Sequence, residues 1–442
     1  LELNIPILGI CYGLQLICKH FNGIIGQSKI REYGHAEINL EKKSILFEGI
    51  KKNNQVWMSH GDHIQKTPKN FVITSNTKNN VISSIENNQK KIFGLQFHPE
   101  VYHTKNGSKI LSNFLNKICL IKKKFKIENF LSNKITDLTK KLKGKKIICG
   151  ISGGVDSTVT SYLIHLVAKK NLYCIFVDHG LLRFNESNEV EKIFKKKFGD
   201  NFIKVNASNI FIKKLKKIKD PEKKRKIIGK TFIDVFEKEA KRIKNVDYLA
   251  QGTLYPDIIE SVPFFEGPTA KIKSHHNVGG LPKRMNLKII EPLKDLFKDE
   301  VRELGKKLKI NNKLLNRHPF PGPGLAIRIP GEVDRKKINI LQRVDHIFIS
   351  YLKNKNIYKD IWQAFVVLLP VKSVGVMGDE RSYSYAVSIR AVTSVDGMTA
   401  DFYMFKKNDL TEISKKIINQ IKEVNRVLYD FTSKPPGTIE WE

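Results

Sequence analysis

The stretch from Lys145 to Thr158 constrains the fold most, because an apolar run passes through a glycine turn into a helical pattern. Residues 147–151 are predicted to form a buried strand, residues 152–154 a tight turn and residues 155–168 a helix. The apolar side of that helix is expected to carry Leu163, Leu166 and Val167. Its first turn directs unpaired N–H groups and the positive end of the helix dipole above the turn. The pattern predicts a phosphate site.

The loop residues refine this prediction. Glycine at 153 and 154 lets phosphate oxygens approach the backbone amides, and Ser152, Ser157 and Thr158 add hydroxyl donors. A Walker loop has a lysine directly before its serine or threonine, whereas this chain has Asp156 there. A carboxylate beside phosphates needs a cation between them, so Asp156 is predicted to hold Mg²⁺ on a departing pyrophosphate. A bare Ser-Gly-Gly would be better explained by a simple turn with a helix-capping aspartate.

The complete loop resembles the PP-loop of the N-type ATP pyrophosphatases, which cut ATP between its α and β phosphates to adenylate an oxygen. That resemblance implies ATP as a substrate. The implied ATP-binding residues are Ser152, Gly153, Gly154, Val155, Asp156, Ser157 and Thr158.

Length and composition set the class of protein. A chain of 442 residues can hold two or three domains, and it has no apolar run near the ~20 residues that span a bilayer. The net charge of +34 would suit a nucleic-acid partner, but the 65 lysines against 13 arginines match a general bias in composition that also favours Asn and Ile. Nucleic-acid binding is therefore a minority expectation, and no membrane partner is expected.

The cysteines and the first residue give two further expectations. Five cysteines without a Cys-x-x-Cys pair favour a reducing cytoplasm. The chain begins at Leu1, with neither a methionine nor a signal peptide, directly before a predicted strand. We expect its front to be truncated.

A second reactive pattern lies near the start. Residues 5–15 are typical of a strand, a sharp turn and a helix, with Cys11 at the apex between Gly9 and Gly13. The helix N-terminus favours the thiolate form of that cysteine. His98 can take the thiol proton and return it to leaving ammonia, and Glu100 can fix the histidine tautomer. The other four cysteines are expected to be structural.

This combination resembles the triad of class I glutamine amidotransferases. The resemblance implies that Gln15 and residues 58–62 surround bound glutamine, while His60 and His63 are expected to be loop or scaffold residues. The family's opening strands and its Gly-Gly-Pro loop are missing. The N–H of Tyr12 could supply one oxyanion donor, and losing the second typically costs ~10²–10³ in rate. We therefore expect a chain that starts at Leu1 to be a poor glutaminase.

The middle of the chain continues the parallel sheet. Strands are predicted at 172–178 and 246–253, and their carboxyl ends place Asp178 and His179 near the adenosine end of the nucleotide. Asp257 and Glu260 are candidates for metal or substrate contact, although carboxylates at the start of a helix would look similar. Residues 271–282 have the composition of a mobile lid, in which Lys273 could neutralise phosphate; its paired histidines are predicted to close over the nucleotide rather than bind zinc.

A proline- and glycine-rich hinge at 317–328 opens the last part. Alternating helices and strands are predicted there at 338–352, 365–370, 383–392 and 413–429. The tail Ser433-Lys-Pro-Pro-Gly-Thr-Ile-Glu-Trp-Glu442 places a lysine beside a stiff Pro-Pro pair. This tail, the segment 374–381, the lid and the two reactive patterns together resemble the family of glutamine-hydrolysing GMP synthetases. The resemblance implies that Lys434 and Glu440 contact XMP and that the last domain forms a homodimer.

The predicted fold class is α/β, in three parts. These are a truncated class I amidotransferase α/β domain (1–120), a PP-loop parallel-sheet α/β domain (121–320) and a small α+β dimerisation and XMP-binding domain (321–442). The implied reaction converts ATP, XMP, glutamine and water to AMP, pyrophosphate, GMP and glutamate. Two alternatives are a related PP-loop enzyme that uses a tRNA base or a carboxylate, and a basic RNA-binding protein without catalysis.

Overall fold

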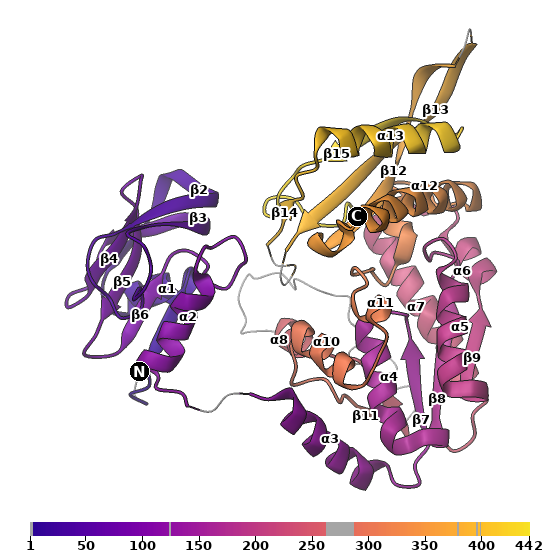
Figure 1. Ribbon diagram of the computed structural model, residues 1–442, viewed down its shortest axis with the longest axis horizontal. Helices are drawn as coiled ribbons and strands as arrows, with labels where there is room; N and C mark the ends of the chain where they lie inside the picture. The colour runs from indigo at the N-terminus through magenta and orange to yellow at the C-terminus, as the bar shows by residue number, and fades with distance from the viewer. Residues whose placement is uncertain (1–2, 123–124, 262–286, 378–379, 395–396, 398) are drawn as a thin grey trace. The chain divides into compact units, whose positions relative to one another are not determined.

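The computed structural model describes the chain except for residues 1–2, 123–124, 262–286, 378–379, 395–396 and 398 (Figure 1). Its contacts divide the chain into two compact units. The first contains residues 1–125, 394–401 and 433–438, and the second contains residues 126–393, 402–432 and 439–442. Among the described residues, no helix is both long and apolar enough to cross a bilayer.

The first unit is built on a six-stranded sheet in the order β1-β6-β5-β4-β2-β3, in which β1 and β6 are parallel and the other neighbours antiparallel. Apolar side chains of α1 and α2 pack against the sheet and form its two cores. The elements are β1 (Ile7–Ile10), α1 (Tyr12–His20), β2 (Ile24–Leu40), β3 (Asn53–Lys66), β4 (Val72–Thr77), β5 (Ile82–Asn87), β6 (Ile92–Leu95), α2 (Gly107–Asn113) and the π-helical turn η1 (Phe114–Ile118).

The second unit contains a five-stranded parallel sheet in the order β11-β10-β7-β8-β9. One face packs on α4, α5 and α10, and the other packs on α6 and α7, so helices cover both faces as an all-parallel sheet requires. The strands are β7 (Ile147–Ile151), β8 (Leu172–Asp178), β9 (Phe202–Asn206), β10 (Tyr248–Ala250) and β11 (Lys288–Ile290). The helices are α3 (Ile127–Leu142), α4 (Val155–Ala168), α5 (Glu186–Phe198), α6 (Ser208–Leu215), α7 (Pro221–Ala240), α8 (Tyr255–Ser261), α10 (Lys298–Lys307) and α11 (Asn312–Leu315), with 3₁₀ turns η2 (Lys169–Asn171) and η3 (Gly199–Asn201).

The predicted strand at 147–151 and helix at 155–168 are confirmed with the same bounds. One side chain of that helix was wrongly assigned. Leu166 is 47% exposed, although helical geometry places it on the same side of α4 as the buried Val155 and Val159, because it lies in the last turn of the helix, near the end at Ala168. The strand predicted at 246–253 is shorter than expected, since only Tyr248–Ala250 pairs with β7 and β11.

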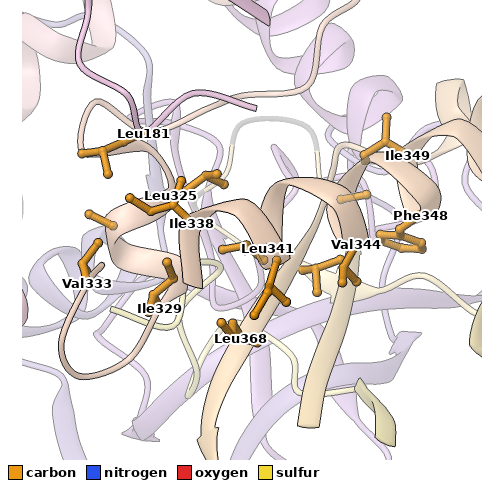
Figure 2. Packing of buried hydrophobic residues seen from close by; sticks show 14 of the residues in the cluster. Leu181, Leu325, Ile329, Val333, Ile338, Leu341, Val344, Phe348, Ile349 and Leu368 are labelled. Atoms are coloured by element: carbon orange, nitrogen blue, oxygen red, sulfur yellow. The ribbon is translucent and has the colours of Figure 1, made fainter. Parts of the chain in front are cut away.

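The rest of the second unit is a sheet in which β13 pairs with β12 antiparallel and with β15 parallel. Its elements are η4 (Gly324–Arg328), α12 (Arg335–Asn354), η5 (Tyr358–Asp360), β12 (Gln363–Met377), β13 (Glu380–Thr393), β14 (Asp401–Phe402), α13 (Lys407–Gln420) and β15 (Val424–Asp430). Figure 2 shows the core beneath α12, where Leu341 and Val344 face Leu368 of β12.

Residues 413–429, predicted as a single element, form two. The helix α13 ends at Gln420, and the following residues form β15. Burial along the start of β15 alternates residue by residue, which is the period of a strand, and its backbone bonds pair with β13. The pairing with β13 therefore makes the second part of this segment a strand.

Candidate active sites

Cys11 lies at a sharp turn between β1 and α1. Its φ of 51° and ψ of −104° lie in a strained region for a residue with a side chain. The backbone doubles back so tightly that a Cβ on Gly9 would lie 2.7 Å from the carbonyl carbon and oxygen of Gly13. Gly13 itself would have room for a side chain. The turn thus needs glycine at position 9 and places Cys11 immediately before a helix N-terminus.

His98 connects Cys11 to Glu100. Its Nδ1 lies 2.6 Å from Oε1 of Glu100, and it also forms a side-chain hydrogen bond with Cys11. Burial lowers the pKa of His98, but the hydrogen bonds and charges of Cys11 and Glu100 outweigh burial and raise it to about 10. The geometry supplies a proton acceptor beside the thiol and a carboxylate behind the acceptor.

The predicted glutamine contacts gather on the same side of the first unit. Gln15 of α1 donates from Nε2 to the carbonyl of Asp62 at 3.0 Å, and the thiol of Cys11 contacts the carbonyl of Ser59 at 3.7 Å. His60 is buried, with Nε2 lying 3.3 Å from a carboxylate oxygen of Glu32. Its internal partner fits the predicted scaffold role.

Sequence reasoning missed Gln96. This side chain is fully buried, and its Nε2 lies 3.8 Å from the sulfur of Cys11, where it can donate to a thiolate. The available signal was its position two residues before His98, because the period of extended chain turns both side chains to one side.

The predicted phosphate loop lies between β7 and α4, at the carboxyl end of a central strand. Gly153 has a φ of +79°, and a Cβ there would lie 2.8 Å from Cγ2 of Val190. The hydroxyl of Ser152 accepts from the N–H of Gly154 at 3.2 Å and lies 3.0 Å from the hydroxyl of Ser157. These bonds hold the loop open above the helix N-terminus.

Thr158 differs from the expectation. It is fully buried, and its hydroxyl donates to the carbonyl of Gly154 at 2.6 Å. The hydroxyl of Ser157 also donates to this carbonyl, at 3.2 Å, and Ser157 is half-buried, whereas Ser152 is exposed at the surface of the loop.

Asp156 lies on the first turn of α4 beside positive charge. Its Oδ2 is 3.6 Å from Nζ of Lys298 on α10, and its buried Oδ1 has no hydrogen-bond partner among the described residues. Burial raises the pKa of Asp156, and the nearby charge of Asp257 raises it further against the opposing charge of Lys298. An unpartnered carboxylate oxygen at a phosphate loop fits Mg²⁺, although the described residues contain no group of three or more acidic, histidine or cysteine side chains able to hold a metal alone.

Arg317 is a second residue that the sequence analysis did not single out for the loop. Its Nη1 donates to the carbonyl of Gly153 at 3.3 Å and lies 3.2 Å from Glu186, while Nη2 lies 3.2 Å from Glu189. The guanidinium ties the glycine turn to α5. No local pattern marked it, since it lies 164 residues further along the chain than Gly153.

Asp178 and His179 follow β8, as predicted. Asp178 lines a cavity of about 530 Å³ together with Asn206 and Arg335, and its Oδ1 accepts from the N–H of Gly180. His179 is buried; burial lowers its pKa to about 4, and its Nδ1 accepts from the N–H of Leu181 at 3.0 Å. His179 is thus a neutral structural acceptor, and its predicted place near adenosine stays a prediction.

The remaining candidates are the two tail residues, the residues of the predicted lid and Glu260. Lys434 belongs to the first unit and donates from Nζ to the carbonyl of Gly397 at 2.7 Å. Glu440 belongs to the second unit and accepts two bonds from Arg328, at 2.8 and 3.1 Å. Lys273 and the predicted lid at 271–282 lie outside the described residues, and so does the side chain of Glu260.

Comparison with known proteins matches three family models along the chain. They are "Glutamine amidotransferase class-I" over residues 1–118, "PP-loop domain" over residues 127–312 and "GMP synthase C terminal domain" over residues 350–441. The matches cover both reactive loops and the tail.

Similar curated proteins extend over the whole chain. A protein of Aquifex aeolicus named "GMP synthase [glutamine-hydrolyzing]" is 52% identical over 441 residues, which is 100% of this chain and 86% of the relative. Proteins with the same name from Thermosipho africanus and Bartonella quintana are 52% and 50% identical, again over 100% of this chain and 86% of each relative.

Proposed function

The chain belongs to the family of glutamine-hydrolysing GMP synthases, and from that premise we propose which residues carry each step. The enzyme converts ATP, XMP, glutamine and water to AMP, pyrophosphate, GMP and glutamate. Membership in this family replaces the two alternatives, a different acceptor and a non-catalytic RNA-binding protein.

Cys11 starts the glutaminase step. Its thiolate attacks the amide carbon of glutamine, His98 gives its proton to the leaving ammonia, and water then hydrolyses the glutamyl thioester to glutamate. Glu100 holds the histidine in its working tautomer, Gln15 holds the substrate, and the N–H of Tyr12 donates to the oxyanion. The hydrogen bonds that connect Cys11, His98 and Glu100 support these roles.

The PP-loop carries the activation step. The C2 oxygen of XMP attacks the α-phosphate of ATP, the bond to the β-phosphate breaks, and pyrophosphate leaves. Amides of residues 153–155 and the hydroxyls of Ser152 and Ser157 bind the phosphates, and Lys298 adds positive charge. Mg²⁺ held by Asp156 would supply further positive charge to the departing pyrophosphate. Ammonia then displaces AMP from C2 to give GMP, because adenylation has made the oxygen a good leaving group.

We further propose the residues that contact XMP, the domain boundaries, the cellular location and the oligomeric state. Lys434 and Glu440 hold XMP, Lys273 closes over the phosphates, and the divisions near residues 120 and 320 separate the three domains. The free state of all five cysteines supports a reducing cytoplasm. A homodimer through the last domain is supported by an apolar cross-strand pair of β12 and β13, Val374 and Tyr383, which are 56% and 66% exposed. Sedimentation of the full chain measures that assembly.

One observation carries the proposed division of labour: the hydrogen-bonded series Cys11, His98, Glu100 occurs in the same chain as a PP-loop. The substitution Cys11→Ala should abolish GMP formation from glutamine and leave the rate with ammonium within about twofold of the parent. Steady-state assays with each nitrogen donor measure both rates. A variant that ammonium cannot rescue would remove Cys11 from the proposed role.

A further inference from the structure

We propose that Arg328 is a positioning residue for the acceptor nucleotide, acting through Glu440. This inference rests on the proposed function, in which Glu440 holds XMP. Arg328 ends the 3₁₀ turn η4, which forms the last part of the proline- and glycine-rich hinge at 317–328, and Glu440 lies in the tail of the chain. The two residues are 112 positions apart, so only the folded second unit brings them together.

The guanidinium of Arg328 is held rigidly. Its side chain has no exposed surface, its Nη2 lies 2.8 Å from Oε1 of Glu440, and its Nε lies 3.1 Å from Oε2. The rings of Phe320 and Phe365 lie 4.9 and 4.3 Å from the guanidinium carbon. A guanidinium that donates to both carboxylate oxygens fixes the direction of the carboxylate as well as its distance. The contacts with the two aromatic rings leave the guanidinium little freedom to rotate.

Glu440 keeps an open side. Its side chain is 16% exposed, and Oε1 also accepts from Nε2 of Gln363 at 2.5 Å. Arg328 and Gln363 together hold both carboxylate oxygens and so fix the orientation of a side chain that stays partly exposed.

The position of Arg328 is also a cost to the fold. Its Nη1 is buried and has no hydrogen-bond partner within the described part of the chain. A buried N–H without a partner destabilises a protein, because the group loses its hydrogen bonds to water and gains none in return. A side chain chosen for stability alone would avoid that cost, so the arrangement favours a functional reason for arginine at this position.

The turn η4 connects Arg328 to the PP-loop sheet. Gly324 has a φ of +62°, and a Cβ there would lie 2.4 Å from the carbonyl oxygen of Leu181, just beyond β8. The same carbonyl accepts from the N–H of Leu325 at 2.8 Å. Figure 2 shows Leu181 and Leu325 together at the end of this core. A fixed path of contacts therefore runs from β8 through η4 and Arg328 to Glu440.

The substitution Arg328→Lys tests this role because lysine keeps the charge and loses the fork. With ammonium as nitrogen donor, we expect the KM for XMP to rise about tenfold, while kcat and the KM for ATP stay within about twofold. Arg343→Lys is the matched control: this arginine of α12 also pairs with a glutamate, Glu423, at 2.7 Å. The control should leave all three constants unchanged.

A double-mutant cycle with Glu440→Gln decides whether Arg328 acts through Glu440. The single variant Glu440→Gln should raise the KM for XMP about tenfold, and adding Arg328→Lys should raise it by no more than about another twofold. A double variant with a rise of about a hundredfold, the product of two independent effects, would overturn the inference and leave the proposed function intact. An unchanged KM in Glu440→Gln alone would instead overturn the proposed role of Glu440.

A second pair covers the case in which Arg328→Lys does not fold. Arg328→Met combined with Glu440→Gln removes both charges together, which buried ion pairs commonly tolerate. Its KM for XMP should lie within about twofold of that of Glu440→Gln alone. A further tenfold rise would show that Arg328 contributes independently of Glu440 and would contradict the inference.

Discussion

At the scale of single residues, the reactive groups are placed by the ends of elements. Cys11 precedes α1 with a strained backbone, and Asp156 lies on the first turn of α4 with one carboxylate oxygen unpartnered among the described residues. Strain and unmet hydrogen bonds cost stability, and they gather where chemistry requires them. Substitutions at these two residues should therefore change activity more than folding.

Asp156→Asn keeps the shape of the side chain and removes its charge. We expect AMP formation from ATP and XMP to fall about 10²–10³-fold and the Mg²⁺ concentration for half-maximal rate to rise, because charge at the leaving group is lost. Asp299→Asn is the control, since Asp299 is exposed on α10 next to Lys298. Brisk AMP formation by Asp156→Asn at the same Mg²⁺ requirement would remove the metal role.

At the scale of elements, the PP-loop shows how a turn is made both tight and open. Gly153 takes a left-handed φ of +79°, and a Cβ there would meet Val190 and Arg317. Gly154 has an ordinary φ of −75°. The atom nearest to a Cβ added at Gly154 would be the hydroxyl oxygen of Ser152, at 3.2 Å. Two adjacent glycines thus serve different needs. The first is required by the backbone, and the second leaves space for a phosphate.

Alanine at each position separates these needs. Gly153→Ala should destabilise the protein by about 1–3 kcal/mol, because alanine is strained at that φ and its methyl meets Val190. Gly154→Ala should cost less than about 1 kcal/mol. Both should raise the KM for ATP. Chemical denaturation and ATP kinetics measure the two effects, and equal losses of stability would contradict this account of the loop.

Local patterns predicted the elements around the reactive loops well. The strand, turn and helix of residues 147–168 have strong apolar periodicity and a glycine turn, and they were placed with the observed bounds. The series Cys11, His98, Glu100 was also visible as short motifs. Distant partners left no local signal. Arg317 reaches Gly153, and Arg328 reaches Glu440, through contacts that only the folded chain creates. The strand β15 was missed for the same reason, because its pairing with β13 decides its conformation.

At the scale of the whole molecule, three histidines make stability depend on pH in two directions. Burial lowers the pKa of His179 to about 4 and that of His318 to about 3, from 6.5. Below pH 6.5 these two histidines therefore bind protons in the unfolded chain but not in the native state, so stability falls towards pH 4. His98 has the opposite sign. Its pKa is raised to about 10, so its contribution is complete below pH 6.5 and is lost as the pH rises to 10.

The thermal midpoint should accordingly be highest near pH 6.5. His318→Gln should reduce the fall in the thermal midpoint between pH 6.5 and 4, because it removes a side chain that binds a proton in the unfolded state but not in the native state. His20→Gln is the control, since His20 is an exposed residue of α1. Calorimetric scans across this range measure the slopes. An unchanged acid slope in His318→Gln would show that other groups determine it.

The central claim is that the PP-loop transfers AMP to the C2 oxygen of XMP before ammonia arrives. XMP labelled with heavy oxygen at C2 tests this claim most directly, with ammonium as the nitrogen donor and mass spectrometry of every product. The account predicts that the label appears in the phosphate of AMP, one atom for each GMP formed. Label found in water or pyrophosphate, with unlabelled AMP, would contradict it.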